Sequence, residues 1–380
     1  MDLLDGVIRS YDWGSTTALA DLRGVAPSGV PEAELWFGAH PSGPATFRAD
    51  GRRATVDEMP FLVKVLAVER PLSLQAHPDE RAARDGHRRE DEAGLATDDP
   101  RRCFPDASAK PEMVCAVGSF EVLCGFRPVD DAVAAGAALG LPRSAVDAVG
   151  RADWSTAVAS LLAATSDDVD GLVSAAHGIA ADGSTDDGHR ATADLVLRLA
   201  ELHPGDPALL LVPLLRHLVL ADGDALFVAP GVLHAHLSGL AVEVMTVSDD
   251  VVRAGLTTKH VDPAALVEVL RPDRVDVIES PTVPVHRYLA GQSGEPEDPM
   301  SKAGVALWRL SGTGLEVDLS DRHGPELVVC TQGTVRIRAA GDRPDLVVGR
   351  GEAAWIGPDE GPAELLVDGT AHRVTVGAIA

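Results

Sequence analysis

Residues 71–79 alternate polar and apolar side chains, and this pattern restricts the possible fold more than any other in the chain. An alternation with a period of two places Ser73, Gln75 and His77 on one face of a β-strand. A strand that carries donor atoms on one face suits a small β-barrel whose interior holds a metal ion. An ordinary sheet with one solvated face produces the same pattern. The stretch therefore predicts β-structure and leaves both interpretations open.

The length and apolar content predict a globular protein of two or three domains, because 380 residues with 45% hydrophobic content can bury a sizeable core. The first residues show no signal peptide, and no apolar run approaches the roughly 18 residues of a membrane helix. The four cysteines have neither metal nor disulfide spacing, which indicates a reducing compartment. We therefore expect a cytoplasmic protein without a membrane partner.

The net charge of −25 argues against a nucleic-acid partner, since clustered Lys and Arg bind phosphate backbones. The same charge opposes an anionic ligand, which would need a local cationic pocket. Only four of the 33 basic residues are Lys, and three of these lie in the motif stretches, namely Lys64, Lys110 and Lys259. Because Lys carries a compact, titratable ammonium, we regard these three as candidate site residues.

Other strand-like stretches also place polar side chains on a common face. Lys110 and Glu112 begin a buried strand, and Pro111 keeps Lys110 extended. In isolation this pair is interpreted as a plain ion pair. In a later stretch His234 and His236 share a face by the same alternation.

Residues near the end of the first β-rich region combine acids with free basic groups. Glu243 lies on a predicted strand, and Asp249, Arg253 and Lys259 follow it around a glycine. In so acidic a chain, Arg253 and Lys259 form a candidate anion clamp. His40 stands beside Pro and Gly, and we interpret it as a hydrogen-bonded loop residue.

An alanine-rich block runs from residue 130 to about 203, with helical spacing over residues 130–139, 156–164, 169–181 and 192–202. Its histidines have no mutual spacing that indicates a site: His177, His189 and His203. Helical structure is also expected at 263–270 and, as a surface helix or loop, within 79–102. From about residue 305 short strands alternate with turns and predict a second all-β barrel or sandwich. Its histidines lack carboxylate partners at ligand spacing, so no metal is expected there: His323 and His372.

Several stretches, in their order along the chain, resemble the type I mannose-6-phosphate isomerases of the cupin superfamily. They are residues 11–15, 34–38, 61–66, 71–79, 110–113, 120–128, 204–206 and 231–259. The resemblance implies a mainly β fold with helices, built from two cupin-like jelly-roll β-barrels and an inserted all-helical domain. It implies three domains. The catalytic barrel comprises residues 1–129 and 204–262, the helical domain residues 130–203, and the metal-free second barrel residues 263–380.

The resemblance also implies interconversion of mannose 6-phosphate and fructose 6-phosphate through a cis-enediol, with one zinc ion per chain. The implied zinc ligands are Gln75, His77, Glu112 and His234. Two imidazoles with two oxygen donors suit Zn²⁺, and a position left for water or substrate makes such a site catalytic. The candidate catalytic residues are Arg253, Lys110, Glu243, Asp249 and His236. The candidate phosphate ligands are Lys64, Lys259 and Arg253.

Three residues depart from the family pattern. Ala109 stands where the family usually has His, His236 where it has Tyr, and Asp250 where it has Asn. These changes bear on the proton path, the orientation of the sugar and the choice of sugar phosphate. Two other functions stay open: an isomerase of a related aldose phosphate, and a metal-binding cupin that senses a sugar. Acid and base groups favour an enzyme, because a sensor needs none.

Overall fold

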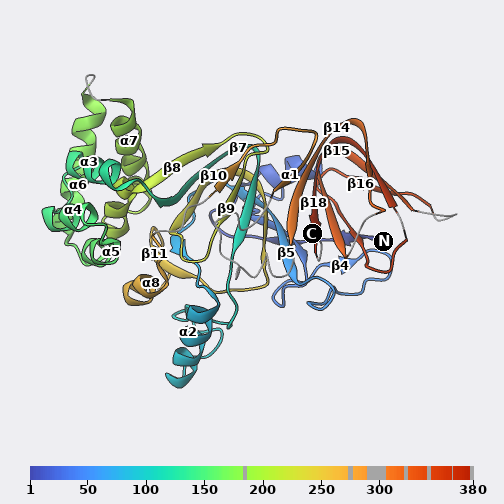
Figure 1. Cartoon of the computed structure of the whole chain (residues 1–380), viewed down its shortest axis with the longest axis horizontal. Coiled ribbons are helices and arrows are strands. Elements are labelled where there is room, and N and C mark those ends of the chain that lie inside the picture. The colour runs from blue at the N-terminus through green and yellow to red at the C-terminus, as the bar shows by residue number, and fades with distance from the viewer. Residues whose placement is uncertain are drawn as a thin grey trace.

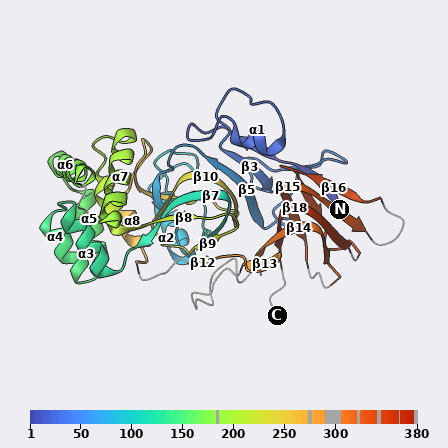
Figure 2. The same ribbon diagram turned by 90° about the horizontal axis from the view of Figure 1, so that it is seen from above.

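The computed structural model describes residues 1–182, 186–272, 277–288, 305–320, 324–339, 344–361 and 363–376. A block of helices, a first sheet and a second sheet follow one another along the long axis of the molecule (Figure 1). The view from above shows the same order, with the first sheet in the middle (Figure 2). The chain is thus mainly β with an inserted helical block, as the sequence predicts. No helix in these residues is both long and apolar enough to span a membrane.

The first sheet holds most of the predicted site residues. Its strands are β2 (Val7–Arg9), β3 (Glu34–Gly38), β5 (Phe61–Val68), β6 (Leu74–Ala76), β7 (Glu112–Phe126), β8 (Leu215–Leu220), β9 (Ala225–Val228), β10 (His234–Thr246), β11 (Val252–Gly255) and β12 (Val277–Glu279). They follow the order β12-β9-β7-β10-β5-β3-β2, and β8 pairs with β7. The short strand β6 pairs with β10 and β11, which brings three polar segments together.

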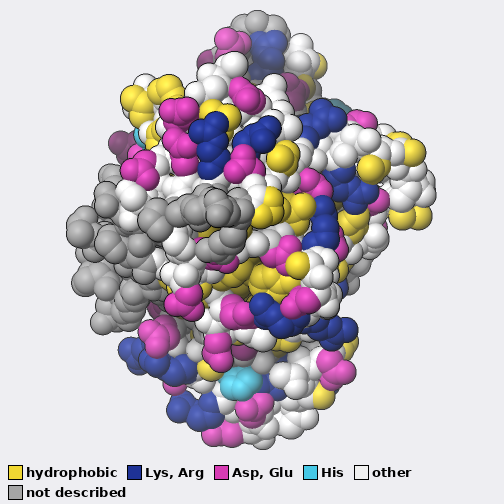
Figure 3. All heavy atoms as spheres, turned by 90° about the vertical axis from the view of Figure 1, so that its right-hand side faces the viewer, with side chains coloured by type: hydrophobic (Ala, Val, Ile, Leu, Met, Phe, Trp, Pro, Cys, Tyr) yellow, Lys and Arg dark blue, Asp and Glu magenta, His cyan; other side chains and the backbone are white. Residues whose placement is uncertain are grey.

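The second sheet combines the two ends of the sequence. Its strands are β1 (Asp2–Asp5), β4 (Thr46–Phe47), β13 (Val285–Tyr288), β14 (Ala306–Asp318), β15 (Glu326–Ala339), β16 (Leu346–Gly349), β17 (Ala353–Ile356) and β18 (Ala363–Thr375). The order is β13-β14-β18-β15-β17-β1-β4, with β16 beside β15. The predicted domain limits stay a prediction, but β1 pairs with β17 and β12 pairs with β9 across them. At this end of the molecule acidic and basic side chains are interspersed (Figure 3).

The helices are α1 (Ala18–Arg23), α2 (Glu80–Glu92), α3 (Val129–Ala138), α4 (Arg143–Gly150), α5 (Trp154–Leu162), α6 (Ser166–Ala181), α7 (Asp187–Leu202), α8 (Pro263–Val269) and the 3₁₀ helix η1 (Pro207–Leu214). The four helices expected in the alanine-rich block correspond to α3, α5, α6 and α7, so these predictions are confirmed. The sequence did not predict α4. This helix is only eight residues long, and its apolar face consists of small residues, mainly Ala and Val.

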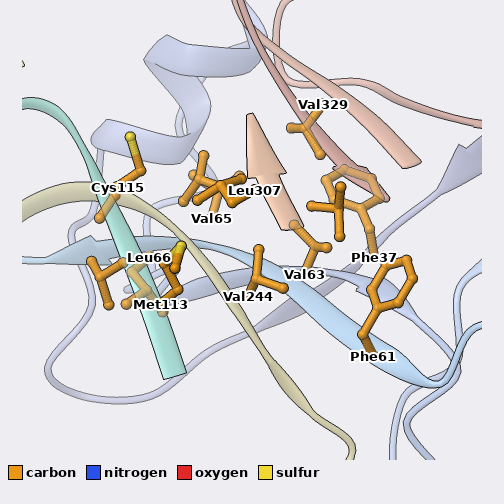
Figure 4. Packing of buried hydrophobic residues seen from close by; sticks show 14 of the residues in the cluster. Phe37, Phe61, Val63, Val65, Leu66, Met113, Cys115, Val244, Leu307 and Val329 are labelled. Carbon is orange, nitrogen blue, oxygen red and sulfur yellow. The ribbon is translucent and has the colours of Figure 1, made fainter. Parts of the chain in front are cut away.

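Side chains from both sheets share one hydrophobic core. In Figure 4, Leu307 and Val329 of the second sheet lie beside Phe37, Phe61 and Val65 of the first. Val63 and Val65 of β5 and Val244 of β10 pack in this core, while the neighbouring Lys64 and Glu243 line a pocket on these strands. The first sheet therefore offers a rigid base for a site.

Two strands are longer than the sequence predicts. Two strands were expected on either side of Gly118, and the structure has the single strand β7. Two more were expected at residues 326–330 and 333–338, the second beginning at Gly333, and β15 runs through both with a register shift between Cys330 and Gln332. Both glycines have positive φ, 81° and 72°, so the backbone bends without ending the strand. Conversely, only residues 74–76 of the predicted strand at 71–79 are a strand.

Candidate active site

A pocket of about 580 Å³ opens beside the first sheet and the end of α7. Strands β3, β5, β6, β10 and β11 line it, together with the loops that precede β6 and follow β10. It collects most of the residues singled out in the sequence: Lys64, Gln75, Lys110, Glu112, His236, Glu243, Asp249, Arg253 and Lys259. Residues from segments far apart in the sequence thus meet at one place.

A buried group of two imidazoles and a carboxylate lies at the inner end of this pocket. Its members are His77 after β6, Glu112 at the start of β7 and His234 at the start of β10, and all three are buried. Their candidate ligand atoms lie within 4.8 Å of one another. Nε2 of His77 is 3.2 Å from Oε1 of Glu112, and Nε2 of His234 is 3.5 Å from Oε2. The structure thus brings together three of the four predicted metal ligands.

The orientation of both rings fits a metal ion. Nδ1 of His77 lies 2.7 Å from the carbonyl oxygen of Asp250, and Nδ1 of His234 lies 3.0 Å from that of Val232. Each Nδ1 therefore carries the hydrogen, and each Nε2 presents its lone pair. Both Nε2 atoms are buried and have no hydrogen-bond partner among the described residues. Burial lowers the pKa of His77 to about 4, which keeps its imidazole neutral.

Gln75, the fourth predicted ligand, lies on β6 directly opposite His234 of β10. On its other side β6 pairs with β11, where Gln75 lies opposite Arg253. The Ser73 hydroxyl donates a hydrogen bond to Oε1 of Gln75 at 2.8 Å, and the Gln75 side chain lines the pocket. Two imidazoles, a carboxylate and an amide oxygen are a donor set that suits Zn²⁺. This assignment of ligands stays a prediction.

A second group of charges lies next to the first. Lys64 on β5 pairs in register with Glu243 on β10, and its Nζ lies 3.1 Å from Glu243 and 3.8 Å from Glu34. Burial opposes the charged form of Lys64, but the carboxylates of Glu243, Glu34 and Glu112 outweigh it and raise its pKa. Burial also raises the pKa of Glu243 to about 7. These contacts place Lys64 beside Glu243, and its predicted role at a phosphate stays a prediction.

The remaining predicted residues lie around this group. Lys110 Nζ is 3.4 Å from Oε1 of Glu112, so the ion pair expected from the sequence is present. His236 is buried, its Nε2 has no hydrogen-bond partner among the described residues, and burial lowers its pKa to about 3. Its ring lies 5.3 Å from that of Phe120. His236 is therefore a neutral imidazole that lines the pocket, with a ring nitrogen within 4.8 Å of carboxylate oxygens of Glu112 and Glu243.

Two cations lie in the same pocket without a carboxylate partner. No ion pair joins Arg253 or Lys259 to another residue in the described part of the chain, although the Lys259 ammonium lies 5.9 Å from the ring of Tyr11. Burial lowers the pKa of both groups, and Arg253 adds to this effect on Lys259. Asp206 holds their segment, because it accepts a hydrogen bond from the backbone N–H of Leu256 at 2.6 Å. The arrangement can receive an anion.

Sequence reasoning missed several residues of the pocket, among them two histidines. Nε2 of His40 lies 3.2 Å from Oδ1 of Asp249, and this contact lowers the pKa of the Asp249 carboxyl. His40 is hydrogen-bonded, as expected, but it also lines the pocket. His203, at the end of α7, lines it as well. In the sequence, the aromatic residues clustered around positions 11–13 and 34–40 could have indicated the part of the pocket that contains His40. The expectation for His323 lies outside the described residues.

Known proteins resemble this chain over nearly its whole length. The sequence model of the phosphomannose isomerase type I catalytic domain matches residues 1–57 and 47–129. A curated mannose-6-phosphate isomerase of Salmonella typhimurium is 31% identical over 400 aligned residues, covering 98% of this chain and 99% of the relative. Another, from Emericella nidulans, is 29% identical and covers 87% of this chain and 85% of its own length.

Solved structures give the same result for the fold. A crystal structure of mannose 6-phosphate isomerase bound with zinc and yttrium matches with a TM-score of 0.84, at 28% identity and with complete coverage of both chains. A zinc-bound holo structure also matches with a TM-score of 0.84, covering 99% of each chain. The likeness therefore includes the helical block and the second sheet as well as the pocket.

Proposed function

This chain belongs to the type I phosphomannose isomerase family, and we propose that it interconverts mannose 6-phosphate and fructose 6-phosphate through a cis-enediol with the help of a bound zinc ion. One observation carries the proposal. The Nε2 atoms of His77 and His234, which have no hydrogen-bond partner among the described residues, converge on Glu112, and Glu112 lines the pocket that also holds Arg253 and Lys259. A metal site and an anion site in one pocket fit a phosphorylated sugar.

The four predicted ligands, Gln75, His77, Glu112 and His234, would hold one zinc ion. Zinc bound there supplies a Lewis acid that can polarise the oxygens of the sugar. The backbone carbonyls that face the two Nδ1 atoms fix the rings, so binding requires little reorganisation. His77, Glu112 and His234 are all buried, and this burial also excludes water that would compete with them for the metal.

Arg253 and Lys259 bind and orient the anionic substrate in this proposal. The net charge of −25 repels a phosphate at long range, but salt screens that repulsion over about 8–10 Å. Charge-assisted hydrogen bonds act at contact distance and are weakened less. Neither cation forms an ion pair within the described part of the chain, which keeps both available for the substrate. Lys259 then holds phosphate, and Arg253 faces the oxygens on which charge develops.

Replacing Lys259 by alanine should raise KM by about 10-fold and leave kcat nearly unchanged, because a contact to phosphate is equal in ground and transition states. Steady-state kinetics in both directions measures this split. Arg143→Ala is the matched control, since that exposed cation on α4 does not line the pocket. A fall in kcat with an unchanged KM would contradict the phosphate role.

Glu243 takes the proton from C2 of the sugar and returns it to C1. Its pKa, raised by burial to about 7, gives the carboxylate useful basicity near neutral pH, and Lys64 holds it in place at 3.1 Å. Lys110 is the alternative group. Glu243→Gln should therefore abolish exchange of the C2 hydrogen with solvent while the sugar phosphate still binds. Persistent exchange in that variant, together with its loss in Lys110→Met, would assign the step to Lys110.

A coupled assay tests the function itself: mannose 6-phosphate is supplied and fructose 6-phosphate is measured, before and after treatment with a chelator. We expect turnover that chelation removes and zinc restores. Binding without turnover would show a sugar-sensing cupin. Turnover of another aldose phosphate alone would show a related isomerase. Activity that resists complete removal of metal would contradict the role of zinc.

A further inference from the structure

Away from the pocket wall, a thiol, an imidazole and a carboxylate meet at the surface. They belong to Cys103, His260 and Asp262, and their candidate ligand atoms all lie within 4.8 Å of one another. Cys103 is buried in the loop between α2 and β7, His260 is exposed, and Asp262 is partly buried at the start of α8. Cys103 and the other two come from distant parts of the sequence, so tertiary packing alone creates this group.

We propose that Cys103, His260 and Asp262 form a second cation site, which binds a thiophilic divalent ion such as Zn²⁺ or Co²⁺. Sulfur, imidazole nitrogen and carboxylate oxygen are the three ligand types of zinc sites, and water completes the coordination. A thiolate ligand selects against Mg²⁺ and Ca²⁺, which prefer oxygen. The proposal does not depend on the isomerase reaction or on the metal in the pocket.

Hydrogen bonds to neighbouring residues hold Cys103 and Asp262 in place and leave ligand atoms available for an ion. Glu90 accepts hydrogen bonds from the backbone N–H groups of Cys103 and Phe104, at 2.8 and 2.9 Å, and so fixes the loop. Oδ1 of Asp262 accepts from the N–H of Ala265, and no described residue donates to Oδ2. His260 makes no hydrogen bond within the described part of the chain, so its exposed ring can turn toward the thiol.

The charges around the thiol also favour a cation. The carboxylates of Glu90, Asp262 and Asp250 place negative charge near the Cys103 thiol, and Arg253 places positive charge there. On the other side Asp99 lies close enough to His260 to interact with it electrostatically. Glu90 and Asp99 are already paired with Arg102 and Arg101, at 3.4 and 2.7 Å, so the attraction on a cation comes chiefly from Asp262. An ion that enters between the three ligands gains from contact with this carboxylate.

An ion at this site would restrain the segment that we propose binds phosphate. The carbonyl oxygen of Cys103 accepts a hydrogen bond from the N–H of Val251 at 3.1 Å, and Arg253 follows two residues later. At the other end of the segment, His260 directly follows Lys259. The ion would thus tie both ends of the anion-binding segment to the loop before β7.

Titration of the zinc-loaded protein with Co²⁺ tests this site. A Co²⁺–thiolate bond gives a charge-transfer absorption band in the near ultraviolet, and the predicted ligands of the pocket include no thiol. We expect the band to saturate at one Co²⁺ per chain. Cys103→Ser should abolish it, and His260→Ala, at an exposed position, should weaken binding at least about 10-fold. Cys330→Ser, which removes a buried thiol in the second sheet, is the matched control and should keep the band.

The proposal is overturned if saturating Co²⁺ gives no thiolate band in the unaltered protein. It is equally overturned if the band survives in Cys103→Ser, or if His260→Ala binds Co²⁺ as tightly as the unaltered chain. Loss of the band in Cys330→Ser alone would place the ion at another thiol. The protein is prepared with one zinc ion per chain, so that the second site is open to Co²⁺. Elemental analysis before the titration should give this same content in all variants, which separates this result from the proposed function.

Discussion

Replacing His77 by alanine should remove both the bound metal and the isomerase activity. The structure leaves Nε2 of His77 buried, without a hydrogen-bond partner in the described region and 3.2 Å from Glu112. Loss of a group that merely supports a ligand costs about 10–100-fold in metal affinity, so loss of the ligand itself should cost more than about 100-fold. Elemental analysis of the purified variant and the coupled assay measure the two effects.

Two variants control this experiment. His372 is as buried as His77, at 1% exposure, but lies in the second sheet. His203 lines the pocket outside the group of three ligands. His372→Ala and His203→Ala should each keep the full zinc content. Full zinc content in a folded His77→Ala protein, or its loss in a folded His203→Ala protein, would show that the metal lies elsewhere.

The replacement of Arg253 by alanine should lower kcat by about 100- to 1,000-fold with a small change in KM, as expected for a donor that acts on charge in the transition state. The guanidinium has no carboxylate partner among the described residues and lies on β11 opposite Gln75, a predicted metal ligand. It is therefore placed where a developing enediolate would meet the metal. Steady-state kinetics of the variant measures the effect.

Arg253→Lys provides the comparison, because lysine keeps the charge and loses the planar fork of donors. We expect it to recover only part of the lost kcat. An unchanged kcat with a raised KM in Arg253→Ala would show that Arg253 only anchors the phosphate. In that case Lys110 and the metal would have to stabilise the intermediate without it.

Much of the candidate site follows from alternation along single strands. The period of two placed Gln75 beside His77, Lys110 beside Glu112 and His234 beside His236 on common faces. The structure brings members of all three pairs into the pocket or to its inner end. The helices of the alanine-rich block were likewise predicted from their spacing, because a strong 3.6-residue period needs no partner to be recognised.

Relations between strands could not be predicted in this way. The pairing of Lys64 with Glu243 depends on the register of β5 and β10, and register is set by the packed core. His40 meets Asp249 only because two loops fold over the same face. No spacing typical of metal ligands could be recognised around Cys103 in the sequence, because His260 and Asp262 approach it from a distant segment.

The placement of β1 in the second sheet constrains the order in which the protein can fold. Asp2 lies opposite Trp355, and Leu4 opposite Ala353, so strands from the two ends of the sequence form one ladder. During synthesis β1 leaves the ribosome early and can pair only with β4 until β17 has been made. The closure of so long a loop is slow. The first sheet and the helical block can therefore form first, while the second sheet is completed only after translation has nearly finished.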